Sequence, residues 1–234
     1  MVDESASGAA STLGSPLRRN WVWWISQIIV GIFFGVWLRF RAYGVERLPA
    51  SGGALLLANH SSFIDPLLIG LPLKRPISYL ARDTLFPIPF VGWMLRHTYV
   101  MPLNRQGGSS AAIRETLRRM EQGFLVGLFP EGTRSVDGQL GPFRPGFAAL
   151  VRRTDLPIIP VGIAGANRAL GRGSIFLKPC RVCVVFGKPL TPTEAAALRE
   201  RGREDELVET VRQRIARYQA EAEAYLTGKT PAEE

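Results

Sequence analysis

The chain has 234 residues, of which 46% are hydrophobic, and it carries a formal net charge of +9. This length suffices for one domain with a sizeable core and short terminal attachments. The positive charge alone would suit nucleic-acid binding, but the aromatic residues gather in apolar segments instead of among the arginines, which argues against a base-stacking surface.

The N-terminal part of the chain combines a polar segment with a long apolar run. We expect residues 1–20, and the tail at 227–234, to be disordered. Trp21 to Leu38 contains no charged residue and has tryptophans near both ends. A helix of this length spans about 27 Å, against a hydrocarbon core of about 30 Å. We predict a membrane-embedded helix over 21–43, and arginines on both flanks favour attachment from one face. The alternative is a buried core helix, which would be unusual with so little polar surface.

The first polar motif follows an apolar run, Ala54 to Ala58, that is typical of a buried strand. His60 lies just beyond this run, and Asp65 lies five residues further on. Histidine is the side chain best suited to accept a proton near neutral pH, and a carboxylate could orient its ring. If Ser62 is a helix N-cap, the bend turns the two side chains toward each other. The alternative is that Asp65 only caps the helix and His60 is an ordinary loop histidine.

Apolar runs alternate with helical patterns along the rest of the chain. This alternation predicts an α/β fold, with a mostly parallel central sheet flanked by helices. An apolar patch at 85–95 is either a helix near a bilayer or acyl groove, or a core helix over the sheet. Strands are expected at 54–58, 77–81, 98–102, 124–128, 157–163 and 181–186. Helices are expected at 63–71, 85–96, 109–121, 145–153 and 204–226.

The second polar motif is Phe-Pro-Glu-Gly-Thr-Arg-Ser at 129–135, directly after another apolar strand. Glycine lets backbone amides approach a ligand, and an arginine can grip a phosphate through two parallel hydrogen bonds. An ordinary turn with a salt bridge is the alternative. Arg105 also follows an expected strand, where the chain continues into a Gly/Ser-rich loop, and it is a further candidate for binding an anion.

Together and in this order, these segments resemble the glycerolipid acyltransferase family, typified by 1-acyl-sn-glycerol-3-phosphate acyltransferase. The family's Asn-His-x-Ser-x-x-Asp motif matches residues 59–65, and its Phe-Pro-Glu-Gly-Thr-Arg-Ser motif matches 129–135 without a substitution. A motif ending in arginine matches Arg105, and an apolar motif around proline matches 156–161. The chain departs from the family at 143–146, where Phe-Arg-Pro-Gly stands for the frequent Phe-Lys-x-Gly.

The resemblance implies an acyltransferase domain over 44–226. Such a domain would move a fatty acyl group from a thioester to the hydroxyl of lysophosphatidate, forming phosphatidate. His60 would be the general base and Asp65 would orient it. The resemblance also assigns residues to substrate binding, with the two arginines on the phosphate, Glu131 on Arg134 or an acceptor hydroxyl, and amides near Gly132 on the oxyanion. These substrate-binding residues are Arg105, Glu131, Gly132, Thr133 and Arg134.

The same resemblance gives the expected partners. Acyl-CoA or acyl-carrier protein would be the co-substrate, without a metal or redox cofactor, and membrane lipids would be the main partners. Residues 21–193 hold 20 Lys/Arg against 8 Asp/Glu, which suits anionic lipids and donors. We expect a cell-membrane protein with its catalytic domain on the cytoplasmic face. The alternatives are an acyltransferase for another lysolipid or an amino-acid lipid, a thioester or lipid hydrolase with the same His-Asp pair, and a non-catalytic lipid-binding protein.

Overall fold

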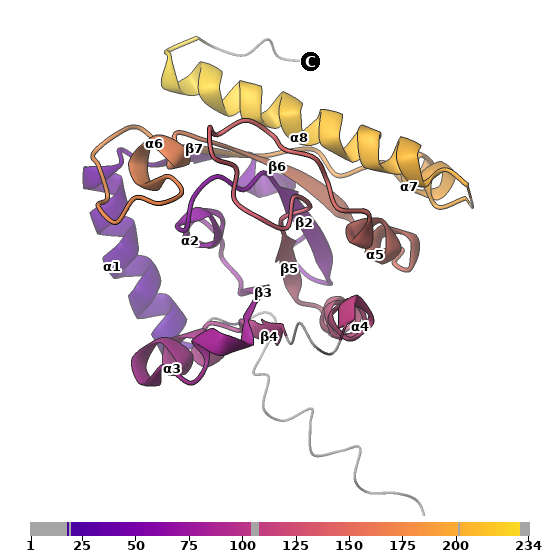
Figure 1. Cartoon of the computed structure of the whole chain (residues 1–234), viewed down its shortest axis with the longest axis horizontal. Helices are drawn as coiled ribbons and strands as arrows, with labels where there is room; N and C mark the ends of the chain where they lie inside the picture. Colours follow the sequence, from indigo (N-terminus) through magenta and orange to yellow (C-terminus); the bar gives the residue numbers. More distant parts are fainter. Residues whose placement is uncertain (1–17, 19, 104–107, 201, 230–234) are drawn as a thin grey trace, which may run out of the picture.

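The computed structural model describes residues 18, 20–103, 108–200 and 202–229. These residues form an α/β fold built on a seven-stranded sheet, with helices on both faces (Figure 1). The predicted fold class is therefore confirmed for the sheet and its flanking helices. The segments expected to be disordered, 1–20 and 227–234, fall largely outside the described residues.

The sheet has the strand order β1-β7-β6-β2-β5-β3-β4. Among these strands the β6–β7 pair is antiparallel and every other neighbouring pair is parallel. Strand β2 therefore lies at the centre, between β5 and β6. The strands are β1 (Arg41–Tyr43), β2 (Ala54–Ala58), β3 (Ile77–Arg82), β4 (Met101–Leu103), β5 (Leu125–Leu128), β6 (Ile158–Ala164) and β7 (Cys183–Phe186).

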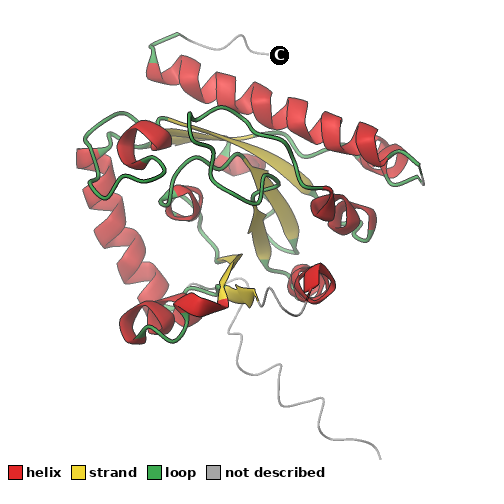
Figure 2. Cartoon of the chain, in the orientation of Figure 1, coloured by secondary structure: helices red, strands yellow, loops and turns green. Residues whose placement is uncertain are grey.

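The helices are divided between the two faces of the sheet (Figure 2). Residues from α1 and α2 pack on the face that carries Leu56 and Ile159. Residues from α4, α5, α7 and α8 pack on the opposite face, which carries Leu55 and Val126. The helices are α1 (Trp21–Trp37), α2 (Asp65–Gly70), α3 (Pro89–His97), α4 (Gly108–Glu121), α5 (Ala148–Arg152), α6 (Ala166–Leu170), α7 (Pro192–Leu198) and α8 (Glu204–Leu226).

The buried strands explain why the sequence folds into a layered structure. All five residues of β2 and all seven of β6 are buried, because helices cover both of their faces. Parallel strands buried on both faces are expected to be almost continuously apolar, as these are. Alternate residues of β2 then enter different cores, Leu56 on the α1 side and Leu55 on the α8 side.

Several predicted element boundaries needed correction. The strand expected at 98–102 begins only at Met101, because Thr98 still closes α3 and Tyr99 takes a φ of 63°. The helix expected at 63–71 begins at Asp65. Three short elements, β1, α6 and α7, were not predicted. They have three, five and seven residues, which is too short for a recognisable hydrophobic periodicity.

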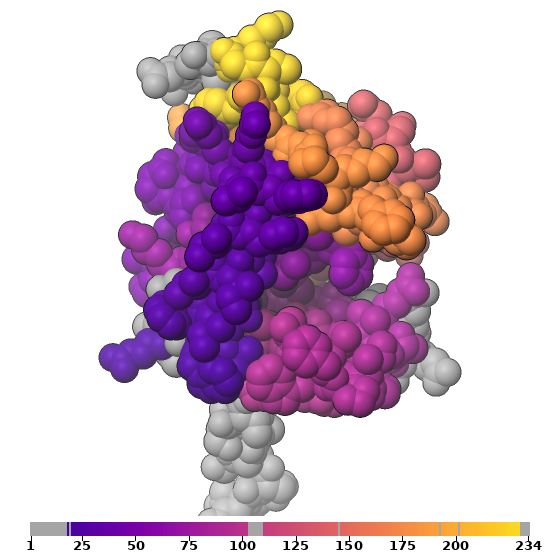
Figure 3. Space-filling model, turned by 90° about the vertical axis from the view of Figure 1, so that its left-hand side faces the viewer, coloured from indigo at the N-terminus to yellow at the C-terminus, as the bar shows by residue number. Residues whose placement is uncertain are grey.

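Helix α1 packs on the domain along one side only. Trp23 and Phe34 are buried against the sheet-facing core, whereas Ile32 and Val36 are 67% and 76% exposed. Figure 3 shows this helix, in indigo, running along one face of the molecule, with α3, in magenta, beside its lower end. Among the described residues, no helix is both long enough and apolar enough to cross a membrane.

Candidate active site

The two polar motifs meet because they follow neighbouring parallel strands. Strands β2 and β5 are paired, with Leu57 opposite Leu128, so both chains leave the sheet at the same edge. His60 comes two residues after the end of β2, and the 129–135 motif begins directly after β5. The carboxyl edge of a parallel sheet is where such folds place their ligands. The backbone amide of Ser135 donates to the carbonyl oxygen of His60 at 2.8 Å, which joins the two segments.

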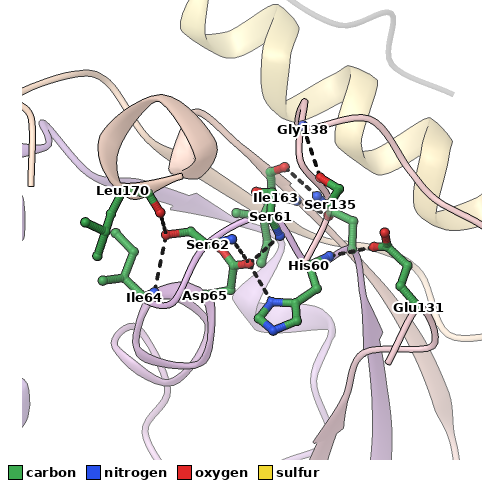
Figure 4. A network of polar contacts seen from close by, with 11 residues as sticks. His60, Ser61, Ser62, Ile64, Asp65, Glu131, Ser135, Gly138, Ile163 and Leu170 are labelled. Atoms are coloured by element: carbon green, nitrogen blue, oxygen red, sulfur yellow. Dashed lines mark hydrogen bonds and ion pairs between the residues drawn. The ribbon is translucent and has the colours of Figure 1, made fainter. Parts of the chain in front are cut away.

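The carboxylate of Asp65 holds the loop that carries His60 (Figure 4). Its Oδ2 atom lies 2.8 Å from His60 Nδ1 and accepts the backbone N–H groups of Ser61 and Ser62, each at 2.7 Å. Asp65 is fully buried, and the His60 side chain is about one-fifth exposed. With Nδ1 facing the carboxylate, Nε2 is the nitrogen left for a ligand, and no described residue hydrogen-bonds to it.

The bend that joins His60 to Asp65 differs from the one predicted. We expected Ser62 to be the N-cap of a helix starting at Phe63, but α2 starts at Asp65 with Ile64 as N-cap. The Ser62 hydroxyl instead donates to the Leu170 carbonyl at 2.7 Å and accepts the Ile64 amide at 3.3 Å. The amides of Ser61 and Ser62 are held by the Asp65 carboxylate, so these residues form a loop and not a first helical turn.

Glu131 has backbone partners that the sequence did not predict. One carboxylate oxygen accepts the His60 N–H at 2.8 Å, and the other accepts the Gly141 N–H at 3.0 Å. Burial raises the pKa of this carboxyl, while the two amides oppose that rise. We expected Glu131 to contact Arg134 or an acceptor hydroxyl, and the contact with Arg134 does not occur among the described residues. Glu131 therefore ties the histidine loop to the segment that follows the second motif.

The imidazole of His60 is the first of three rings that stack in series. The imidazole of His60 stacks on Phe129, with centroids 4.1 Å apart, and Phe129 stacks on Tyr79 at 6.3 Å. Gly127, opposite Tyr79 in the β3–β5 pair, provides the space for the Tyr79 ring, because a Cβ there would lie 2.1 Å from Tyr79 Cε1. Burial keeps the pKa of Tyr79 well above its ordinary value, and Asp65 raises it further.

The loop after Glu131 brings arginines and free amides to the same edge. Gly132 has a φ of +64°, and a Cβ there would lie 2.7 Å from Arg144 Cδ, so the Arg144 side chain runs across it. Arg172 Nη1 lies 3.5 Å from the Arg134 carbonyl oxygen. In the part of the chain that the structure describes, none of these three arginines pairs with a carboxylate. Arg105 lies outside the described residues.

The backbone amides of this loop divide into used and unused donors. The Gly132 N–H already donates to the Phe129 carbonyl at 3.0 Å, so of the amides near Gly132 that we expected at the oxyanion, this one is already used. The N–H groups of Thr133 and Arg134 donate no hydrogen bond within the described residues. Thr133 is exposed and Arg134 is half-buried. Unused N–H donors and arginines without a carboxylate partner are groups suited to binding an anion, and this loop presents both beside His60.

Comparison with known proteins identifies the family. The family model described as "Acyltransferase" matches residues 39–164, which include His60, Asp65 and the whole 129–135 motif. The chain belongs to the acyltransferase family. This match covers more than half of the chain and both segments of the site.

Two relatives of this acyltransferase-family chain are named for the same activity. It is 30% identical over 80% of its length to 1-acyl-sn-glycerol-3-phosphate acyltransferase LPAT1, chloroplastic, of Arabidopsis thaliana, and it spans 53% of that protein. It is 26% identical over 81% of its length to 1-acyl-sn-glycerol-3-phosphate acyltransferase of Bacillus subtilis, and it spans 90% of that protein. The chain thus spans about half the length of the plant relative.

A solved structure has the same fold. The crystal structure of the 1-acyl-sn-glycerophosphate acyltransferase PlsC from Thermotoga maritima matches with a TM-score of 0.72 and 27% sequence identity. The match covers 86% of this chain and 79% of that one. The mostly parallel sheet described above is therefore shared with a member of the same family.

Proposed function

We propose that this protein is a 1-acylglycerol-3-phosphate O-acyltransferase, which moves a fatty acyl group from an acyl thioester to lysophosphatidate and forms phosphatidate. The observation that carries the proposal is the contact of 2.8 Å between His60 Nδ1 and Asp65 Oδ2. This contact leaves Nε2 free at the edge of the sheet, beside a loop whose arginines have no carboxylate partner among the described residues. The activity for which these two relatives are named supports the same acceptor.

The acid–base chemistry follows from the orientation of the imidazole. Nε2 accepts the proton of the acceptor hydroxyl as its oxygen forms a bond to the thioester carbonyl carbon. Asp65 stabilises the imidazolium formed in this step, since its carboxylate faces Nδ1. When the tetrahedral intermediate collapses, the carbon–sulfur bond breaks, and His60 returns the proton to the leaving thiolate. No covalent acyl-enzyme is required.

The loop at 132–144 supplies the groups that stabilise the thioester oxyanion and those that bind the acceptor phosphate. The N–H groups of Thr133 and Arg134 are donors for the thioester oxyanion. The guanidinium groups of Arg134 and Arg144, neither paired with a carboxylate among the described residues, hold the acceptor phosphate. Positioning the phosphate brings the acceptor hydroxyl to His60 and converts a chance encounter into an oriented reaction. Arg105 is assigned to the same phosphate on the basis of its motif alone.

The proposed setting is the cytoplasmic face of the cell membrane. The outward side of α1 is apolar along its length and begins and ends with exposed tryptophans, Trp21 and Trp37. Tryptophan at both ends suits the bilayer interface, and the buried side of the helix fixes it to the domain. Acyl-CoA or acyl-carrier protein would reach the site from the cytoplasm. No metal or redox group enters this reaction.

The test is an acyl-transfer assay with the full chain purified in detergent. A labelled acyl thioester is offered with lysophosphatidate, with uncharged monoacylglycerol, or with no acceptor. His60→Ala removes the base and Asp65→Asn removes the charge that stabilises the imidazolium, so each should lower kcat by about 10²- to 10⁴-fold. Far-UV circular dichroism of each variant checks that the fold is intact.

The three acceptor conditions separate the alternatives. Labelled phosphatidate that depends on His60 supports the proposal. Transfer to monoacylglycerol in preference to lysophosphatidate would discard the phosphate assignment and keep the chemistry. Free fatty acid released equally in all three tubes would identify a hydrolase. Full activity of His60→Ala would contradict the assignment of this histidine as the base.

A further inference from the structure

The segment between α6 and β7 presents two large apolar side chains to solvent. Ile175 is 83% exposed and Phe176 is 73% exposed. They lie at the tip of residues 171–178, which we call the 171–178 loop. Single exposed apolar residues are common on proteins, but an adjacent Ile-Phe pair at a loop tip needs an explanation.

Hydrogen bonds within the loop fix this exposure. The Ser174 amide donates to the Gly171 carbonyl at 3.1 Å, the Ser174 hydroxyl donates to the Phe176 carbonyl at 3.1 Å, and the Lys178 amide donates to the Ala169 carbonyl at 2.9 Å. Leu177, the next residue, turns inward and packs against the main core. The loop is therefore anchored at its base, with Ile175 and Phe176 on its outer side.

The loop lies beside the C-terminal end of α1. Trp37 Nε1 donates to the Leu177 carbonyl at 3.0 Å, which joins the last residue of the helix to the loop. In Figure 3 the loop, in orange, lies next to the indigo helix on the same face, and a hollow separates it from α3 below. The loop thus extends the exposed apolar side of α1, which includes Val36, to one side of the helix axis.

The charged residues of the 171–178 loop have a single sign. Arg172 and Lys178 are exposed on either side of Ile175 and Phe176. The sequence contains no Asp or Glu between Asp155 and Glu194. Apolar side chains that enter the acyl region, with cations at the level of the lipid phosphates, are the pattern of an interfacial membrane anchor.

We propose that the 171–178 loop is a second membrane-binding element, which inserts Ile175 and Phe176 into an anionic bilayer beside α1. This inference rests on the proposed membrane attachment of the protein. A single helix lying in the interface leaves the domain free to roll about the helix axis. A second contact off that axis fixes the roll and holds the carboxyl edge of β2 toward the lipid. Phe63, three residues after His60 and 65% exposed, lies at that edge.

The experiment measures co-sedimentation of the full chain with vesicles of phosphatidylcholine and phosphatidylglycerol, and with vesicles of phosphatidylcholine alone. The test variant is Ile175→Asp/Phe176→Asp. The matched control is Ala216→Asp/Ala220→Asp, which adds the same charge to exposed positions of α8 on the other side of the sheet. We expect the loop variant to lose roughly 10- to 100-fold in partition to the anionic vesicles, because the burial of two apolar side chains is lost. The control should bind as wild type does, and Ile175→Leu/Phe176→Trp should restore binding.

Activity in two substrate forms separates this inference from the proposed function. The loop variant should lose transfer to vesicle-embedded lysophosphatidate but keep it with a short-chain acceptor below its micellar concentration. Loss of partition in a chain that never transfers acyl groups would keep the loop assignment and reject the enzyme.

Partition within twofold of wild type would overturn the loop assignment. The loop assignment would also be overturned if the wild type is a dimer, the loop variant is a monomer and partition is unchanged. The loop would then contact a second copy of the chain. Equal binding to the uncharged vesicles would overturn the role given to the cations.

Discussion

The imidazole of His60 lies flat against Phe129, with ring centroids 4.1 Å apart and planes inclined by 18°. Asp65 fixes one edge of the imidazole through Nδ1, and Phe129 covers one of its faces. The hydrogen bond sets the tautomer, whereas the ring contact limits rotation about the Cβ–Cγ bond. Both restraints are needed to keep Nε2 aimed at one position.

Phe129→Leu should therefore impair the reaction while the protein still folds. Leucine keeps most of the apolar volume but loses the flat surface under the imidazole, so we expect kcat to fall about tenfold with little change in the KM for the acyl donor. The matched control is Phe124→Leu, a buried ring that contacts Tyr99 at 5.6 Å between centroids and lies directly before β5, at the end away from the site. Equal losses in kcat for both variants would assign the effect to general loosening of the fold.

Arg134→Ala should act mainly on binding of the phosphate. Removing an unpaired guanidinium from the loop at 132–144 should raise the KM for lysophosphatidate by roughly 10- to 100-fold, since a charge-assisted contact is worth about 1.5–3 kcal/mol. The KM for monoacylglycerol should not change. Arg153→Ala, at an exposed position after α5, changes the same charge away from the site and serves as control. If Arg134→Ala leaves the KM for lysophosphatidate unchanged, the phosphate does not bind there.

Gly127→Ala should disturb the ring stack from below. The added Cβ would lie 2.1 Å from Tyr79 Cε1, so Tyr79 must move and Phe129 with it. Overpacking of this kind costs about 1–3 kcal/mol, which urea unfolding would measure. Gly35→Ala in α1 is the control, because its Cβ would meet nothing within 4 Å, and replacing a helical glycine should be neutral or stabilising. Similar losses at both positions would show that the Tyr79 contact is not the cause.

The pKa of Glu131 gives a prediction for stability against pH. Burial raises this pKa above its ordinary value of 4.5, so the folded protein holds the proton more tightly than the unfolded chain. Glu131 thus contributes stability that is complete below pH 4.5 and lost as the pH rises through the folded-state pKa. The free energy of unfolding of wild type, minus that of Glu131→Gln, should fall as the pH is raised from about 4 to 7. A rise over that range would mean that the amides of His60 and Gly141 dominate and lower the pKa.

The sequence predicted the central elements well because their signals are local and strong. The strand at 54–58 and the helix at 204–226 have the predicted bounds, since one is a fully apolar run and the other a long amphipathic repeat. The short strand β1 has only three residues and depends on pairing with β7, which no local pattern reveals. The late start of β4 depends on the positive φ of Tyr99, a conformation that side chains other than glycine rarely adopt.

The candidate site was predicted only where its signals are local in the sequence. The pairing of His60 with Asp65 followed from their spacing across a strand end, and the structure places them in contact. The partners of Glu131 could not be predicted, because both are backbone amides and every residue except proline has one. The stacking of Phe129 depends on the register between β2 and β5, which the sequence does not state. Arg144 was noted only as a departure from the family pattern, and its position across Gly132 was not foreseen.

The way Asp65 closes the histidine loop bears on how such an enzyme can diverge. The His60–Asp65 contact spans five positions, whereas the link from His60 to Glu131 spans 71. The pair proposed for proton transfer is thus contained in one short stretch of chain, and the groups proposed to hold the phosphate come from a separate stretch. Mutations in the second stretch can change which acceptor is bound while the surroundings of His60 Nε2 stay the same. Duplicated copies of such a gene can therefore explore new lipid acceptors without first losing the ability to transfer an acyl group.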